Sequence, residues 1–276
     1  MPEGHTLHRL ASALGDAFAG GRVRATSPQG RFAESAALLD GRVLASTEAY
    51  GKHLFMTFDE LDVVHVHLGL YGKFDVHRGV GDVPEPVGQV RLRLVGGDAY
   101  ADLRGATACE LLTPVERTTI LGRLGPDPLR PEADPDLAWE RIRRSRAPIG
   151  GLLMDQSVVA GIGNVYRAEL LFRHRVDPFR PGQSLRARQW QEMWADLVAL
   201  MADGVSTGRI DTVRPEDLTD AEIAHVGPRR GHSYVYRRAG EPCRVCGGRV
   251  RTATLQTRNL YWCGTCQRRY RPRAKP

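Results

Sequence analysis

The first residues of the chain carry an amine with the chemistry of a nucleophile. An initiator methionine before Pro2 is normally removed, because proline is small enough for the processing enzyme. The α-amino group so exposed titrates near pH ~8, against roughly 10.4 for a lysine, so more of it is unprotonated at neutral pH. Such an amine can attack a carbonyl-like carbon to form a Schiff base, and a neighbouring acid such as Glu3 can move a proton. The alternative is that Pro2 and Glu3 only begin a helix, which proline and acidic residues both favour.

Four of the five cysteines lie within the last 34 residues, in the pattern Cys243-x2-Cys246 and Cys263-x2-Cys266 with sixteen residues between the pairs. Two such pairs can supply four thiolates to one tetrahedral zinc ion, and four unrelated thiols are improbable at this spacing. Four cysteines fill the coordination of the ion, so we expect one structural zinc and no organic cofactor. The segments on either side of residues 257–259 would then form a small hairpin with Arg258 at its tip.

Glycine-rich segments suggest two further sites. Residues 161–164 read Gly-Ile-Gly-Asn, which lacks the preceding strand and third glycine of a dinucleotide loop. They are better interpreted as tight turns before a helix whose first N–H groups and Asn164 bind phosphate, although Asn164 as a simple helix cap is the commoner explanation. Leu70 and Tyr71 lie between glycines in residues 67–72, either as a protruding wedge or as a turn folded back onto the core.

Lys52, after Gly51, points either at a phosphate or at solvent.

The charge of the chain is unevenly distributed. Residues 225–276 contain thirteen Lys or Arg residues and one acid, Glu241, a net charge of +12. Because the whole chain carries +7, the other 224 residues carry a net charge of −5. A basic segment on a mildly acidic body favours a polyanion partner, with nucleic acid as the leading candidate. No apolar run approaches the length of a membrane span and no signal segment opens the chain, so we expect a cytoplasmic protein that does not contact membranes.

The elements that must position these residues follow from periodicity. Apolar residues at helical spacing predict one helix from Pro2 to about Gly20, and short alternating runs from Arg22 to about Leu112 predict antiparallel strands of a β-sandwich or barrel. Five prolines between residues 114 and 135 discourage helices and strands and indicate a linker. Helical spacing returns after Asp136, which we expect to cap a helix to Ile142. Further helices are predicted from Met154, from Asn164 to Leu171, and from a Ser184 cap to Gly204.

Taken together, these segments resemble the bacterial DNA glycosylase/AP lyases of the formamidopyrimidine-DNA glycosylase and endonuclease VIII type. The resemblance covers nearly the whole chain, and its six pieces occur in the order of that family. They are Pro2-Glu3-Gly4, Gly51-Lys52, His67-Leu68-Gly69, Leu124-Gly125-Pro126, Met154–Asn164 and the four-cysteine zinc finger.

The resemblance implies an α+β multidomain fold with DNA bound in a cleft. The expected parts are a catalytic β-sandwich with flanking helices (1–113), a linker (114–135), a helix–two-turns–helix domain (136–237) and a zinc-finger hairpin (238–276). The implied function is that of a bifunctional DNA glycosylase/AP lyase of base excision repair. It would remove oxidised bases and then cut the strand by β,δ-elimination, acting as a monomer on damaged double-stranded DNA in association with the nucleoid.

The resemblance also implies catalytic roles for four residues. Pro2 would attack C1′ of the deoxyribose, and Glu3 would donate or shuttle a proton at the sugar. Lys52 and Arg258 match positions that the family uses for proton donation during strand cleavage.

Contacts with DNA are implied for further residues. Lys52, Asn164 and Arg258 would hold phosphates around a flipped nucleotide, and Glu169 matches an acidic position that we assign to DNA binding. Leu70 and Tyr71 would fill the space left in the base stack.

Departures from the family pattern bear on the substrate. The second Pro-Glu pair common in the family is replaced by His5-Thr6, which removes an acidic helper. Gly4 and the Leu70-Tyr71 pair look like the endonuclease VIII branch. Arg104-Gly105-Ala106 lacks the phenylalanine wedge expected of the branch that removes oxidised purines. Oxidised pyrimidines are therefore the predicted substrates. The alternatives are an enzyme that mainly cuts abasic sites and a non-catalytic zinc-ribbon protein that binds DNA.

Overall fold

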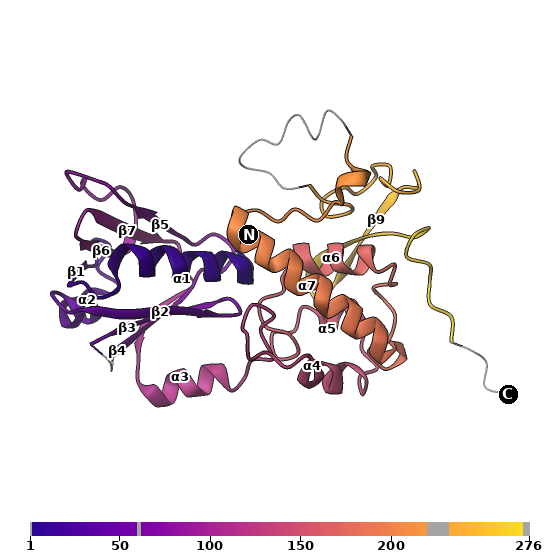
Figure 1. Ribbon diagram of the computed structural model, residues 1–276, viewed down its shortest axis with the longest axis horizontal. Coiled ribbons are helices and arrows are strands. Elements are labelled where there is room, and N and C mark those ends of the chain that lie inside the picture. The colour runs from indigo at the N-terminus through magenta and orange to yellow at the C-terminus, as the bar shows by residue number, and fades with distance from the viewer. Residues whose placement is uncertain (1, 60–61, 220–231, 273–276) are drawn as a thin grey trace. The chain divides into compact units, whose positions relative to one another are not determined.

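The structure, a computed structural model, describes residues 2–59, 62–219 and 232–272. It divides into two compact units, Met1–Arg123 and Leu124–Pro276. Each unit has its own buried core. Figure 1 shows the β-rich first unit and the mainly helical second unit. Among the described residues, no helix is both long and apolar enough to cross a membrane.

The first unit contains two four-stranded antiparallel sheets. One sheet has the strand order β1 (Arg24–Thr26), β6 (Val90–Gly96), β7 (Ala99–Arg104), β5 (Lys73–His77). The other has the order β2 (Leu44–Tyr50), β3 (His53–Phe58), β4 (Asp62–His67), β8 (Ala108–Leu112). Helices α1 (Gly4–Phe18) and α2 (Ala33–Leu39) flank the sheets (Figure 1). Helix α2 interrupts the segment predicted as strands, because Ala33-Glu34-Ser35-Ala36-Ala37 consists mostly of helix-forming residues.

The core of the first unit follows the alternation read from the sequence. Leu54, Met56 and Phe58 of β3 are fully buried, as are Leu92 and Leu94 of β6, and all five belong to one apolar cluster. The apolar stripe of α1 packs into the same cluster, which is why the helix needs no strong end cap. The predicted β-sandwich with flanking helices is confirmed.

The expectation that residues 114–135 contain no helix was wrong for their first part. Helix α3 spans Pro114–Leu121 and begins with a capping box in which Thr113 Oγ1 accepts from the Glu116 amide and the Glu116 carboxylate accepts from the Thr113 amide. Proline is well tolerated at the first helical position because its missing N–H has no partner there anyway. The sequence rule that proline breaks helices therefore did not apply at Pro114.

The second unit contains four α-helices, two short 3₁₀ helices and a two-stranded hairpin within the residues that the structure describes. The elements are α4 (Pro135–Ile142), α5 (Ile149–Leu152), α6 (Asn164–Arg173), η1 (Gly182–Ser184), α7 (Ala187–Thr207), η2 (Pro215–Asp217), β9 (Val250–Leu255) and β10 (Arg258–Cys263). The helical domain with a terminal hairpin is confirmed. Trp190, Met193 and Leu197 of α7 are buried in the apolar core of this unit, as their spacing predicts.

Three local predictions in this unit were wrong. Asp134 rather than Asp136 caps α4, because its side chain accepts from the Asp136 amide. The segment from Met154 forms consecutive turns instead of a helix, and Gln156 bonds the Gly161 amide and the Ile162 carbonyl across them. Ser184 ends η1 and does not cap α7, which continues past Gly204 to Thr207.

Candidate active site and nucleic-acid interface

Helix α1 runs antiparallel to β2, which brings Pro2 to the turn that carries Lys52. The Gly20 amide after α1 bonds the Leu44 carbonyl at the start of β2, and Thr47 Oγ1 in the middle of β2 donates to the Ala11 carbonyl. The N-terminal end of α1 is therefore directed toward the end of β2, where Gly51 (φ +57°) turns the chain into β3. Pro2 and Lys52 are both partly exposed there.

Glu3 is fully buried at the start of α1, and its carbonyl accepts from the Thr6 amide at 2.9 Å. His5 and Thr6 stand in the place of the family's second Pro-Glu pair, so Thr6 occupies the acidic position, and the neighbouring His5 is 4% exposed. Burial is the main reason that the pKa of His5 falls to about 4. His5 is therefore neutral at pH 7, so it does not replace the missing acid with a charged group.

Leu70 and Tyr71 protrude from a tight loop at the same end of this unit. His67 of β4 pairs with His53 of β3, so the loop after β4 lies beside the Lys52 turn. A Cβ on Gly72 would stand 2.3 Å from the Leu68 carbonyl oxygen, and Gly69 adopts φ +66°, so both glycines are needed for this turn. The side chains it presents are 40% exposed for Leu70 and 86% for Tyr71. They do not fold back onto the core.

In the second unit, Asn164 binds the hairpin and does not cap its own helix. Asn164 is the first residue of α6, and its Nδ2 donates to the Asn259 carbonyl at 2.9 Å. Arg167, one turn later and fully buried, donates to the same carbonyl at 3.1 Å and also to the Asn164 side chain. The helix start and the hairpin are thereby joined at the residue next to Arg258.

Arg258 is exposed as the first residue of β10, directly after a two-residue turn formed by Gln256 (φ +49°) and Thr257 (φ +61°). The predicted hairpin is confirmed, with its tip one residue earlier than expected. Positive φ at both central residues is typical of the two-residue turn that joins the twisted antiparallel strands of a hairpin.

Arg258→Ala is expected to weaken binding to duplex DNA by about 3- to 10-fold and to lower the slope of log K against log salt by about 1, as loss of one phosphate contact would. Fluorescence anisotropy across a salt series measures both. Arg188→Ala is the control, because Arg188 is exposed on α7 beside Glu192. Equal slopes for wild type and Arg258→Ala would exclude a phosphate contact.

Glu169 is fully buried and organises the backbone of the second unit. One carboxylate oxygen accepts from the amides of Val235 and Tyr236, and the other accepts from the Tyr234 amide and Thr212 Oγ1, at 2.6 to 2.9 Å. With both oxygens engaged, we propose that Glu169 serves DNA binding by holding residues 234–236.

Glu169→Gln is expected to lower the free energy of unfolding by about 3 kcal/mol, because an amide NH2 in place of either oxygen leaves two buried donors without an acceptor. Urea denaturation measures this change. Glu192→Gln removes a half-exposed partner of Arg188 and should cost less than about 0.5 kcal/mol. Similar losses for the two variants would contradict the organising role of Glu169.

The four cysteines predicted to bind zinc lie together at the base of the hairpin. The Sγ atoms of Cys243, Cys246, Cys263 and Cys266 all lie within 4.8 Å of one another. The Cys243–Cys266 and Cys246–Cys263 pairs are 3.8 and 3.5 Å apart. Tetrahedral zinc with bonds of about 2.3 Å requires sulfurs about 3.8 Å apart, so these residues fit a structural zinc ion. Four thiolates leave no position for substrate.

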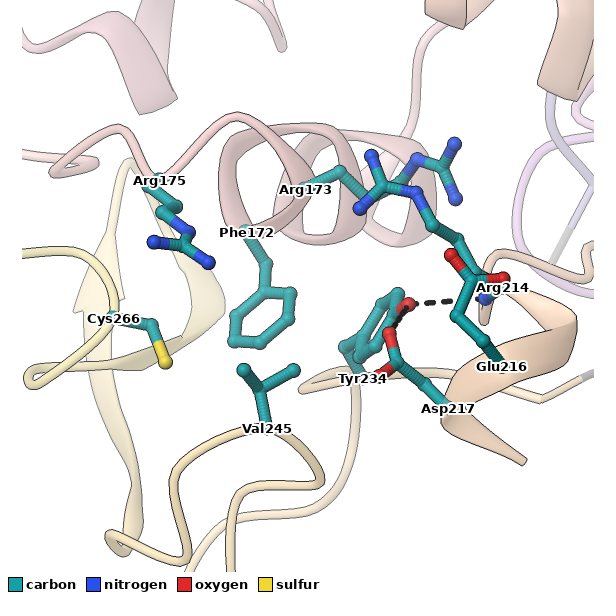
Figure 2. Close-up of a pocket in the computed structure, with 9 residues that line it drawn as sticks. All are labelled: Phe172, Arg173, Arg175, Arg214, Glu216, Asp217, Tyr234, Val245 and Cys266. Carbon is teal, nitrogen blue, oxygen red and sulfur yellow. Dashed lines mark hydrogen bonds between the residues drawn. The ribbon is translucent and has the colours of Figure 1, made fainter. Parts of the chain in front are cut away.

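A pocket of about 190 Å³ opens at the C-terminal end of α6, away from Asn164 (Figure 2). The rings of Phe172 and Tyr234 stack at 4.7 Å on its apolar side. Figure 2 shows the Tyr234 hydroxyl bonded to Asp217, and burial is the main cause that raises the pKa of Tyr234 to about 12. None of the residues predicted for catalysis lines this pocket.

Two groups of residues were not identified from the sequence. Arg167 stands three residues after Asn164, a spacing that places both on one helix face, and this signal was available. His53 joins His65 and His67 on one sheet face, and alternation along two strands could have shown this only with the strand register known.

Comparisons with known proteins agree with this arrangement. Residues 1–109 match the formamidopyrimidine-DNA glycosylase N-terminal domain, residues 124–215 the formamidopyrimidine-DNA glycosylase H2TH domain, and residues 240–269 the zinc finger found in FPG and IleRS. "Endonuclease 8 1" of Mycobacterium tuberculosis is 56% identical over 97% of this chain and 100% of its own length. "Endonuclease 8" of Escherichia coli is 32% identical with the same coverage.

The fold is shared with solved structures. The Lactococcus lactis Fpg in complex with DNA containing an abasic site superimposes with a TM-score of 0.76 at 21% identity, covering 97% of this chain and all of that one. The domain matches and the relatives' identity together establish that the chain belongs to the formamidopyrimidine-DNA glycosylase/endonuclease 8 family.

Proposed function

We propose that the chain is a bifunctional DNA glycosylase/AP lyase that uses the amine of Pro2. The observation that carries this proposal is the gathering of Pro2, Glu3, Lys52 and the Leu70–Tyr71 loop at one end of the first unit. An amine, a buried acid, a cation and an exposed wedge are the groups that base removal from a flipped nucleotide requires.

The chemistry then follows from one amine. Pro2 nitrogen attacks C1′, the base leaves, and the resulting imine makes the 2′ protons acidic. Loss of a 2′ proton expels the 3′ phosphate, and a second elimination releases the 5′ phosphate. Glu3 and Lys52 move protons at these steps. Asn164 and Arg258 support the DNA from the second unit, and the zinc ion holds the hairpin that carries Arg258.

Oxidised pyrimidines in duplex DNA are the proposed substrates. The Arg104 guanidinium is engaged in hydrogen bonds within the protein. It pairs with Asp102 at 2.8 Å and donates to the Val87 carbonyl at 2.9 Å. Gly105 and the buried Ala106 offer no wedge, so Leu70 and Tyr71 are the protruding side chains at this end. We further propose that the enzyme acts as a monomer, in the cytoplasm and on the nucleoid.

A second candidate is a lyase that acts mainly at abasic sites. Thr6 stands where the family commonly has a second acid, and the adjacent His5 is neutral, so protonation of a departing base has less assistance. An abasic site contains no base to remove, so its cleavage would be unaffected.

Borohydride trapping on duplexes containing thymine glycol, 8-oxoguanine or an abasic site tests both candidates. The proposal predicts covalent adducts with thymine glycol and abasic DNA and little with 8-oxoguanine. Adducts with the abasic duplex alone would favour the lyase. No adduct with any duplex would leave a non-catalytic DNA-binding protein.

A further inference from the structure

Three histidines and a glutamate form a titratable cluster that the proposed mechanism does not use. His53 on β3, His65 and His67 on β4 and Glu110 on β8 lie on one face of their sheet, opposite the buried Leu54 and Val66. His65 is 4% exposed, whereas the side chain of Glu110 is 53% exposed. His53 directly follows Lys52 in the chain.

The cluster contains a continuous hydrogen-bonded line from Glu110 to His53. Glu110 Oε1 is 2.9 Å from His65 Nδ1, and His65 Nε2 is 2.8 Å from His53 Nδ1. The rings of His53 and His65 stack with centroids 5.1 Å apart, and His67 meets the His53 ring edge-on at 5.1 Å. The line therefore joins a solvent-exposed carboxylate to the ring of His53, the residue that follows Lys52 and whose charged form Lys52 disfavours.

The same geometry fits two protonation states. A carboxylate only accepts, so in the neutral line His65 Nδ1 donates to Glu110, His53 Nδ1 donates to His65 Nε2, and His53 Nε2 is an acceptor. With one more proton, His65 is an imidazolium ion paired with Glu110. It then donates to His53 Nδ1, and His53 Nε2 carries a hydrogen. A proton taken up at His53 thus places its charge on His65.

The surroundings disfavour a charge on His53 itself. Burial is the largest cause that lowers its pKa to about 3, and His65, His67 and Lys52 act in the same direction. Burial also lowers the pKa of His67, again with His65 and Lys52 contributing. From the other elements, Glu48 of β2 pairs with Arg117 of α3, whose guanidinium lies over Phe55.

We propose that Glu110, His65 and His53, here called the histidine relay, return a proton to Lys52 during strand cleavage. The relay rests on the proposed function, in which Lys52 donates a proton to a departing phosphate. The N–H bond at His53 Nε2 then breaks and an N–H bond forms on the Lys52 amine. The His65 Nε2 proton moves to His53 Nδ1, which leaves His65 neutral and Glu110 still a carboxylate. A water molecule from solvent then gives a proton to His53 Nε2 and leaves as hydroxide, which restores the charged relay.

The direction of transfer is downhill. An imidazolium is a stronger acid than a lysine ammonium, so a proton held on the relay moves to the Lys52 amine. The transfer matters most for the second elimination. Two phosphates leave in succession from one bound strand. The Lys52 ammonium has one proton to give, so it is a neutral amine after the first phosphate has left. None of the relay residues needs to touch DNA, because they act through Lys52.

The test is product analysis on an abasic duplex in single turnover, with His65→Gln, His53→Gln and Glu110→Gln. The first elimination leaves an unsaturated aldehyde at the 3′ end, and the second leaves a 3′ phosphate. Wild type should yield mainly 3′ phosphate. Each variant should slow formation of the 3′ phosphate at least ~10-fold. This is less than the ~10²- to 10⁴-fold of direct acid–base assistance, because the relay acts through Lys52. Borohydride trapping should change less than ~3-fold. Imidazole in the buffer should restore the 3′ phosphate for His53→Gln.

His77→Gln is the control, because His77 is exposed on β5 and stacks on Tyr100 outside the relay. Unchanged product ratios in all three variants would overturn the relay. Equal losses of both eliminations would do so as well, since they indicate a structural role. Wild type that stops at the aldehyde would also contradict it. Glu110→Gln alters a half-exposed side chain, so it keeps the test valid if His65→Gln fails to fold. Failure of the proposed function is distinguishable, because wild type would then give no trapped adduct at all.

Discussion

Insertion of one alanine between Met1 and Pro2 is expected to abolish strand cleavage and borohydride trapping. The Pro2 nitrogen becomes an amide without a nucleophilic lone pair. The new terminal amine is displaced by about 3.8 Å along the chain, and a misplacement of about 1 Å alone can cost ~100-fold. We expect the single-turnover rate to fall by at least ~10³-fold, toward the ~10⁶-fold seen when an enzyme loses its nucleophile.

Binding is the internal control for this variant. Pro2 is one partly exposed residue, and the residues proposed to hold phosphates, Asn164 and Arg258 among them, lie elsewhere in the chain. Affinity for a duplex with a non-cleavable abasic analogue should therefore change less than about 3-fold. Cleavage that survives the insertion within 10-fold of wild type would show that Pro2 is not the nucleophile.

Cys263→Ser is expected to have the second largest effect, on binding. Cys263 is fully buried in β10, the strand that begins with Arg258. Structural zinc in small fingers contributes on the order of 10 kcal/mol to folding, so loss of one of four thiolates should release the ion and loosen the hairpin. We expect DNA affinity to fall by ~100-fold or more, since each 1.4 kcal/mol of lost contact free energy is tenfold.

Anisotropy and zinc analysis of the purified variant measure this prediction. Cys109→Ser is the matched control, because Cys109 is the lone thiol of the first unit, and burial raises its pKa to about 12. It should retain one zinc ion and wild-type affinity. Full affinity of Cys263→Ser without bound zinc would show that the hairpin does not need the metal.

Local chemical signals in the sequence were sufficient for much of the site. The cysteine spacing predicted a cluster that the structure confirms, because metal ligands must be arranged on tight knuckles. The glycines around Leu70 and Tyr71 predicted a turn, but only the structure shows that both side chains protrude. The exposure of a side chain depends on which other residues pack against it. The glycines that indicate a turn carry no information about those neighbours.

Long-range partners could not be predicted. Glu169 and the backbone of residues 234–236 are more than sixty residues apart, and no local pattern marks a carboxylate that accepts four hydrogen bonds. Asn164 resembled a helix cap because its partner, the Asn259 carbonyl, is 95 residues away. Helix α3 was missed for the opposite reason, since the local cap from Thr113 outweighed a general rule about proline.

Identification of the amine that binds DNA tests the central claim most directly. The chain contains three lysines, Lys52, Lys73 and Lys275, which with the N-terminus are its only primary or secondary amines of this kind. Borohydride-trapped adduct on an abasic duplex should be digested and analysed by mass spectrometry. The account predicts that Met1 is absent and that the sugar remnant is attached to the peptide that begins at Pro2. A remnant on Lys52, or an adduct formed by chains that retain Met1, would contradict it.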